Sequence, residues 1–348
     1  MKKFNEVAIN KMETLIKELV EAYGPSGEEA AVRELIEEKI KDSVDRTFTD
    51  NLGNLFAIRE GAAPLLMFSA HMDEIGVIVT HIDDNGFLRI APIGGVAPHL
   101  LVGQRLSFKN GVTGTVYHEK IKALKELDWP KLYLDIGAAG AAAAREHIRI
   151  GDMACLHQPF VNLGGRYMAK AMDDRIGCAV LVEAARRLPG SLPQGVCFVF
   201  SVQEEVGLRG ATTAAYRLEP DYGFAVDVTL VGDTPEAPLM AVSLGQGPAI
   251  KVKDRSVLCH PRVRELMIET AEKHKIPYQL EVLERGGTDA GAIHLSREGV
   301  PSGAISIPCR YVHSPSEMVD AGDVAHAVEL IEKIIMVSWP LPDSGSGA

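Results

Sequence analysis

The stretch from Phe198 to Gly210, FVFSVQEEVGLRG, constrains the fold of this chain more than any other. It begins as a run of β-branched and aromatic residues that is apolar on both faces, which predicts a central strand covered by helices. The run ends on two adjacent carboxylates, Glu204 and Glu205, whose side chains point in opposite directions on extended backbone. Functional groups of open α/β sheets gather at the carboxyl ends of strands. An isolated Glu-Glu pair would more often be a solvated turn, so the functional interpretation depends on the rest of the chain.

The rest of the chain alternates predicted strands and helices on both sides of a central block. An α/β fold is therefore expected. Strands are predicted at 44–50, 54–60, 65–70, 196–202, 222–228, 278–284 and 303–307, and helices at 6–23, 27–41, 178–188, 209–217, 261–275 and 320–337. Ser26, with Glu29 three residues later, predicts a capping box for the second helix. The Pro-, Gly- and Ser-rich tail from Trp339 to Ala348 is expected to fray.

The block 75–165 differs from the flanking segments in composition and in its predicted secondary structure. It contains short β segments with frequent glycines and hairpin signals such as Asp83-Asp-Asn-Gly86 and Asn110-Gly111. Such a pattern is typical of a small barrel or sandwich. We expect two domains: a discontinuous catalytic α/β domain, 1–74 and 166–348, and an inserted β-rich domain, 75–165.

Five residues of metal-ligand type lie at or near the ends of predicted elements: His71, Asp173, Glu205, Asp227 and His313. Two imidazoles and three carboxylates suit Zn, Co or Mn, and five ligands suit two ions that share one carboxylate. The natural division places His71 and Asp227 on one ion and His313 and Glu205 on the other. Asp173 and Asp174 are both candidates for the bridge, and either could instead cap the following helix.

Composition excludes several classes of function. The 46% apolar and 24% charged residues are ordinary for a globular protein, and the net charge of −11 argues against nucleic acid or an anionic membrane as a partner. No apolar run approaches the length of a membrane span. Five scattered cysteines without CxxC spacing favour a reducing cytoplasm.

Six motifs carry a family resemblance: His71-Met-Asp73, Ala171-Met-Asp-Asp-Arg175, Gln203-Glu-Glu-Val-Gly207, Val226-Asp227, Gly286-Gly-Thr-Asp-Ala-Gly291 and Tyr311-Val-His-Ser-Pro315. This set resembles the glutamyl/leucyl aminopeptidase family of di-metal peptidases, the tetrahedral or TET aminopeptidases, some of which carry cellulase M-like labels. The resemblance extends from the first helix to about residue 337. It implies a three-layer, phosphorylase/hydrolase-like α/β core with an inserted PDZ-like barrel that mediates dimerisation, and dimers that assemble into a dodecamer.

The resemblance also implies the site roles. Asp173 bridges the two ions, Glu204 is the general base, Asp73 orients His71, and Thr288 and Asp289 contact the substrate. The reaction is then hydrolysis of the N-terminal residue of a peptide by a water that two metal ions activate. The alternatives are a cellulase-type glycoside hydrolase, in which two carboxyls would flank a sugar bond, and a non-enzymatic metal-binding assembly protein.

Overall fold

The computed structural model describes residues 6–342, and within this range eleven strands form one mixed sheet. Its centre is parallel, with β12 next to β3, β3 next to β13 and β13 next to β16. The strands along the sheet are β1 (Arg46–Thr49), β2 (Leu55–Arg59), β12 (Gly195–Ser201), β3 (Leu65–His71), β13 (Tyr222–Thr229), β16 (Ser302–Arg310), β17 (Glu317–Asp320), β11 (Arg166–Ala169) and β10 (Val161–Asn162). In addition, β14 (Ala249–Lys253) pairs with β16, and β15 (Gln279–Val282) pairs with β14.

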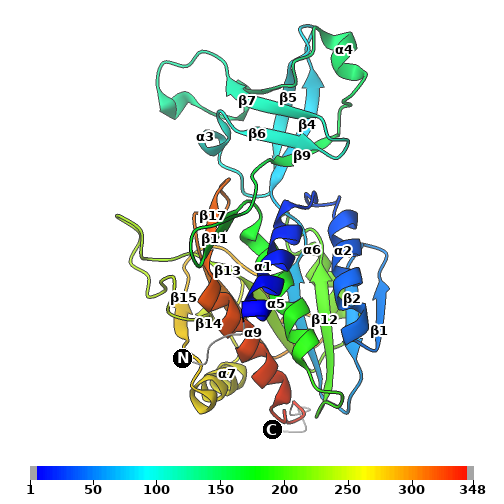
Figure 1. Cartoon of the computed structure of the whole chain (residues 1–348), viewed down its shortest axis with the longest axis vertical. Helices are drawn as coiled ribbons and strands as arrows, with labels where there is room; N and C mark the ends of the chain where they lie inside the picture. The colour runs from blue at the N-terminus through cyan, green and yellow to red at the C-terminus, as the bar shows by residue number, and fades with distance from the viewer. Residues whose placement is uncertain (1–5, 343–348) are drawn as a thin grey trace.

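Helices cover both faces of this sheet, which gives the three layers that the sequence predicted (Figure 1). One face is covered by α1 (Glu6–Glu21), α2 (Ala30–Ile40), α5 (Met172–Arg187), α7 (Pro261–His274) and α9 (Ala321–Met336), and the other by α6 (Arg209–Leu218) and α8 (Ala290–Ile293). The central strands are apolar on both faces for this reason. Phe68, Phe198 and Phe224 are fully buried against one another on the α5 side. Each such side chain stabilises the fold by about 1.5–3 kcal/mol.

A closed barrel is inserted between β3 and β10 and stands apart from the large sheet (Figure 1). Its strands, in barrel order, are β4 (Gly76–Ile82), β5 (Leu88–Ile93), β8 (Leu132–Asp135), β7 (Thr113–His118), β6 (Arg105–Phe108) and β9 (Met153–Leu156). Two short helices, α3 (Pro98–Leu101) and α4 (Ala141–Arg145), accompany them. The barrel has its own apolar core, which includes Val77, Leu106, Val116 and Leu134. The expected barrel within an α/β fold is therefore confirmed.

Three local expectations were wrong. The helix expected to begin at Cys178 begins at Met172, although Asp173 and Asp174 keep non-helical dihedral angles. No side chain caps α2, because Ser26 and Glu29 make hydrogen bonds to distant segments instead. Trp339 is buried, and its indole N–H donates to the Ile334 carbonyl at 2.9 Å. The rest of the tail expected to fray includes 343–348, which lie outside the described residues.

Candidate metal centre

The five ligand candidates converge at the carboxyl-end edge of the parallel strands. His71 is the last residue of β3, Asp227 lies in β13, and Glu205 follows β12. Asp173 lies in the first turn of α5, and His313 follows β16. The sheet order brings these segments together because β12, β3, β13 and β16 are consecutive parallel neighbours. Parallel strands end at the same edge of a sheet, so groups far apart in the sequence meet there.

Asp173 lies between the two histidines. Its Oδ1 is 3.0 Å from Nε2 of His71, and its Oδ2 is 3.2 Å from Nε2 of His313. Burial works to raise the pKa of Asp173, but its bonds to His313 and His71 outweigh burial and lower that pKa. The two oxygens of the Asp173 carboxylate therefore face two different imidazoles.

Glu204 and Glu205 lie in a turn after β12 and not on extended backbone, and their carboxylates lie near different histidines. Oε1 of Glu205 lies 3.1 Å from Nε2 of His313, whereas Oε2 of Glu204 lies 3.9 Å from Nε2 of His71. Oε1 of Glu205 is buried, and its contact with the His313 ring is an ion pair that lacks hydrogen-bond geometry. Burial and the nearby carboxylates raise the pKa of both side chains, although His71 acts in the opposite direction on Glu204.

Asp73 is fully buried and lies beside His71 on the opposite side of the ring from Asp173. Nδ1 of His71 is 3.4 Å from Oδ1 of Asp73 and 3.1 Å from its main-chain oxygen. Burial favours a lower pKa for His71, but hydrogen bonds to Asp173 and Asp73 outweigh it and raise the pKa well above its usual value. A carboxylate on the far nitrogen fixes the ring orientation and makes the imidazole a better ligand.

Asp174 binds main-chain amides close to the centre. Its carboxylate accepts hydrogen bonds from the main-chain N–H groups of His71 at 3.2 Å and Gly177 at 3.0 Å. A Cβ at Gly177 would collide with this carboxylate, which explains the glycine. Asp174 thus binds an amide at the start of α5, as the capping alternative predicts. It also lies close enough to His71 and Asp227 for these three to share an ion.

The donor chemistry fits divalent metal ions. Within the described residues, two groups could hold an ion: His71, Asp174 and Asp227, and His71, Asp173 and Glu205. Burial and repulsion from Asp173 raise the pKa of Asp227 well above its usual value. Burial and repulsion from Asp227 likewise raise the pKa of Asp174. Buried carboxylates crowded in this way are costly unless a cation neutralises them. The ligand types suit Zn, Co or Mn.

One further acidic residue, Glu317, holds the backbone of two ligand candidates. Glu317 was not identified from the sequence. Its carboxylate accepts from the main-chain N–H of Asp173 at 2.9 Å and from that of His313 at 2.7 Å. Burial and Asp173 raise its pKa to about 8. Nothing in the local pattern distinguishes Glu317 from a surface acid, because both partners are set by the fold.

The loop before α8 places Thr288 and Asp289 behind the metal centre, and both are buried. Oδ2 of Asp289 accepts hydrogen bonds from the hydroxyls of Ser69 and Ser201, each at 2.6 Å. Its Oδ1 and the Thr288 hydroxyl have no hydrogen-bond partner among the described residues. Two serines from neighbouring central strands therefore hold Asp289 against the sheet.

A three-layer α/β core with a His and carboxylate centre at its strand ends, and an inserted barrel, defines the class of metal-dependent peptidases. The model of one family in that class, described as M42 glutamyl aminopeptidase, matches residues 53–330. The chain belongs to this family, and the sequence-based prediction of an aminopeptidase is confirmed. A relative from Acetivibrio thermocellus described as a putative aminopeptidase is 52% identical over 92% of this chain and 97% of its own.

Solved structures agree with the fold. An aminopeptidase from the archaeon Desulfurococcus kamchatkensis is 40% identical, with a TM-score of 0.90 over 94% of this chain and 95% of its own. The TET1 peptidase of Pyrococcus horikoshii, described as assembling into a tetrahedron or a large octahedral shell, is 33% identical, with a TM-score of 0.84 over 93% and 99% of the two chains. A Thermotoga maritima protein described as an endoglucanase is also 33% identical, with a TM-score of 0.79 over 92% and 96%.

Proposed function

We propose that this aminopeptidase removes N-terminal residues from peptides with two divalent ions held on the shared carboxylate of Asp173. The observation that carries the proposal is the position of Asp173, whose two oxygens face His71 and His313 at 3.0 and 3.2 Å. His71 and Asp227 would hold one ion, and His313 and Glu205 the other. Asp174 is the less favoured bridge, because its carboxylate already accepts two main-chain N–H groups.

When bound, two such ions polarise the scissile carbonyl and lower the pKa of the attacking water. Glu204 is the proposed general base. Its carboxylate is nearly buried. Oε2 lies 3.9 Å from Nε2 of His71, which is close to the centre but beyond hydrogen-bond distance of that ring. It takes the proton of the attacking water and passes it to the nitrogen of the leaving amine, so the peptide bond breaks and no net proton is consumed. Asp73 holds the ring of His71 in place for its ion.

The loop before α8 is the proposed wall of the substrate pocket, with Thr288 and Asp289 as its polar residues. Asp289 acts electrostatically on both Glu204 and Asp227, which supports its proximity to the reacting groups. We assign no preference for the first residue of the substrate. Zn, Co and Mn are the proposed metals on the basis of the mixed N and O ligand set. A cytoplasmic location is proposed because all five cysteines are free and buried thiols.

Assembly through the inserted domain, 75–165, is the remaining part of the proposal. The barrel has a separate core and projects from the catalytic sheet, as a docking module would (Figure 1). The assembly described for the Pyrococcus horikoshii peptidase supports a homo-oligomer. We propose a dodecamer built from dimers. Glycoside hydrolysis is less favoured, because it would leave His71, His313 and Asp227 without a role.

An activity panel tests the proposal. The purified protein is stripped with a chelator, reloaded with Zn, Co or Mn, and assayed on aminoacyl chromogenic substrates beside carboxymethyl-cellulose. The proposal predicts chelator-sensitive release of the chromophore from at least one aminoacyl substrate, with no release of reducing sugar. Cellulose hydrolysis that survives the chelator would contradict it.

A further inference from the structure

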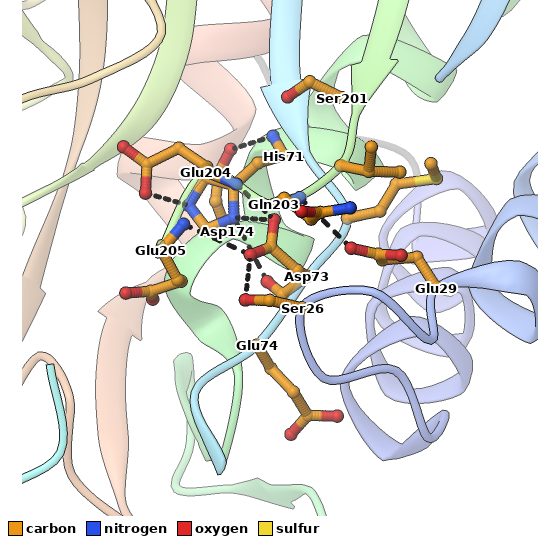
Figure 2. Close-up of polar contacts among 12 residues, drawn as sticks. Ser26, Glu29, His71, Asp73, Glu74, Asp174, Ser201, Gln203, Glu204 and Glu205 are labelled. Carbon is orange, nitrogen blue, oxygen red and sulfur yellow. Dashed lines mark hydrogen bonds and ion pairs between the residues drawn. The ribbon is translucent and has the colours of Figure 1, made fainter. Parts of the chain in front are cut away.

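The turn Gly24–Glu29, between α1 and α2, lies against the catalytic segments although it is far from them in the sequence (Figure 2). The hydroxyl of Ser26 donates to Oδ2 of Asp73 at 2.6 Å. Oε1 of Glu29 accepts from the N–H groups of Gly27 at 2.7 Å and Gln203 at 3.1 Å. The two residues that would form a capping box are thus directed to the site instead of to their own helix.

Three consecutive amides of the turn after β12 are bound by these carboxylates. The N–H of Gln203 donates to Glu29, that of Glu204 donates to Oδ1 of Asp73 at 2.9 Å, and that of Glu205 donates to Oδ2 of Asp73 at 3.2 Å. Gln203 adopts a left-handed conformation with φ of 55°. A non-glycine residue disfavours this region, so external hydrogen bonds are needed to hold it there. This backbone conformation sets the directions in which the Glu204 and Glu205 carboxylates leave the chain.

The turn is itself fixed to the segments that carry the other ligands. The N–H of Glu74 donates to the carbonyl of Gly24 at 3.0 Å, just after His71 and Asp73 in the chain. The guanidinium of Arg175, which directly follows Asp173 and Asp174, donates to the same carbonyl at 3.1 Å. Hydrogen bonds to both ligand-bearing segments therefore fix the turn that carries Glu29.

We propose that the Gly24–Glu29 turn is a positioning element for the general base, in which Glu29 holds the amide of Gln203 and Ser26 holds the carboxylate of Asp73. Neither residue occupies the ligand set, so both act through the backbone of Glu204. The inference rests on the proposed function, since it requires Glu204 to be the base. Loss of such supporting contacts costs roughly 10–100-fold in activity, as a 1 Å displacement of a reacting group does.

The test is a double-mutant cycle. Glu29→Ala and Ser26→Ala are made in the native chain and in the Glu204→Gln background, and kcat, KM and metal content per chain are measured. Glu34→Ala is the matched control, because Glu34 is an exposed acid on α2, the helix that begins directly after Glu29. In the native chain we expect each test variant to lower kcat roughly 10–100-fold with little change in KM or metal content. In the Glu204→Gln background we expect less than about a twofold further loss, because the residue they position no longer acts as a base.

The outcomes separate the inference from the proposed function. Equal losses in both backgrounds, loss of metal, or native kcat in both test variants would overturn the positioning role while leaving Glu204 as the base. Native kcat in Glu204→Gln alone would overturn the base assignment and the inference together. If Glu29→Ala fails to fold, Ser26→Ala decides the question, because it removes only one hydroxyl from the same network.

Discussion

His71 and His313 are separated by most of the chain, yet their Nε2 atoms face the two oxygens of the same carboxylate, that of Asp173. The distances, 3.0 and 3.2 Å, are nearly equal. This symmetry is what a bridging ligand between two ions requires. Asp174, its neighbour, is bound to main-chain amides and lacks such symmetry.

The bridge assignment is tested by comparing Asp173→Asn with Asp174→Asn. We expect Asp173→Asn to lose at least one ion per chain and nearly all activity, because both ions lose a charged ligand. We expect Asp174→Asn to retain two ions at saturating metal, because its amide oxygen still accepts a main-chain N–H. Elemental analysis after gel filtration gives the answer, and the reversed pattern would assign the bridge to Asp174.

Metal removal should destabilise the fold. Without cations the buried carboxylates of Glu204, Glu205 and Asp227 repel one another, and metal at about 100 times its Kd adds about 2.7 kcal/mol to the free energy of unfolding. We expect the thermal midpoint to fall after chelation and to recover with Zn, Co or Mn but not with Na. Asp173→Asn is the control, since its midpoint should respond weakly to the chelator. A native midpoint that is independent of chelation would contradict the proposed ion binding.

The role of the barrel in assembly can be tested by excision. Gly76 of β4 and Cys155 of β9 are paired neighbours, so residues 77–154 can be replaced by an Asn-Gly turn without moving the catalytic sheet. We expect the native chain to form a particle of twelve times its 37.6 kDa mass by light scattering. The excised chain should form a much smaller species. An unchanged number of chains per particle after excision would show that assembly does not depend on the barrel.

Arg175 should be essential to stability. It is fully buried, and its guanidinium donates to the carbonyls of Met72, Leu19 and Gly24 and pairs with Glu74. Arg175→Met would remove the donor to these carbonyls and leave Glu74 paired with Lys170 alone, at a cost of about 1–3 kcal/mol for a buried acceptor that loses its partner. Thermal unfolding should show a large fall in midpoint, whereas the exposed Arg186→Met should be nearly neutral. Equal midpoints for the two variants would contradict this role for the guanidinium.

The sequence predicted what depends on local pattern. Strand ends locate functional groups, so His71 and Glu205 could be proposed from apolar runs that stop on polar residues, and Asp227 from a charge inside an apolar run. Ser26, Glu29 and Glu317 could not, because their partners are distant segments that only the fold brings together. Ser26 and Glu29 show the limit most clearly. Their capping motif is present in the sequence, but Ser26 bonds to Asp73, which is 47 positions further along the chain, and Glu29 bonds to Gln203, which is 174 positions further along.

The assignment of Glu204 as the base and Glu205 as a ligand is tested most directly by measuring kcat and metal content for Glu204→Gln and Glu205→Gln. General acid–base catalysis contributes roughly 10²–10⁴-fold, so Glu204→Gln should lower kcat by at least that range while two ions per chain remain. Glu205→Gln should instead lower metal occupancy, and excess metal should restore part of its rate. Exchanged phenotypes would make Glu205 the base. A Glu204→Gln enzyme with full metal and near-native kcat would contradict the account.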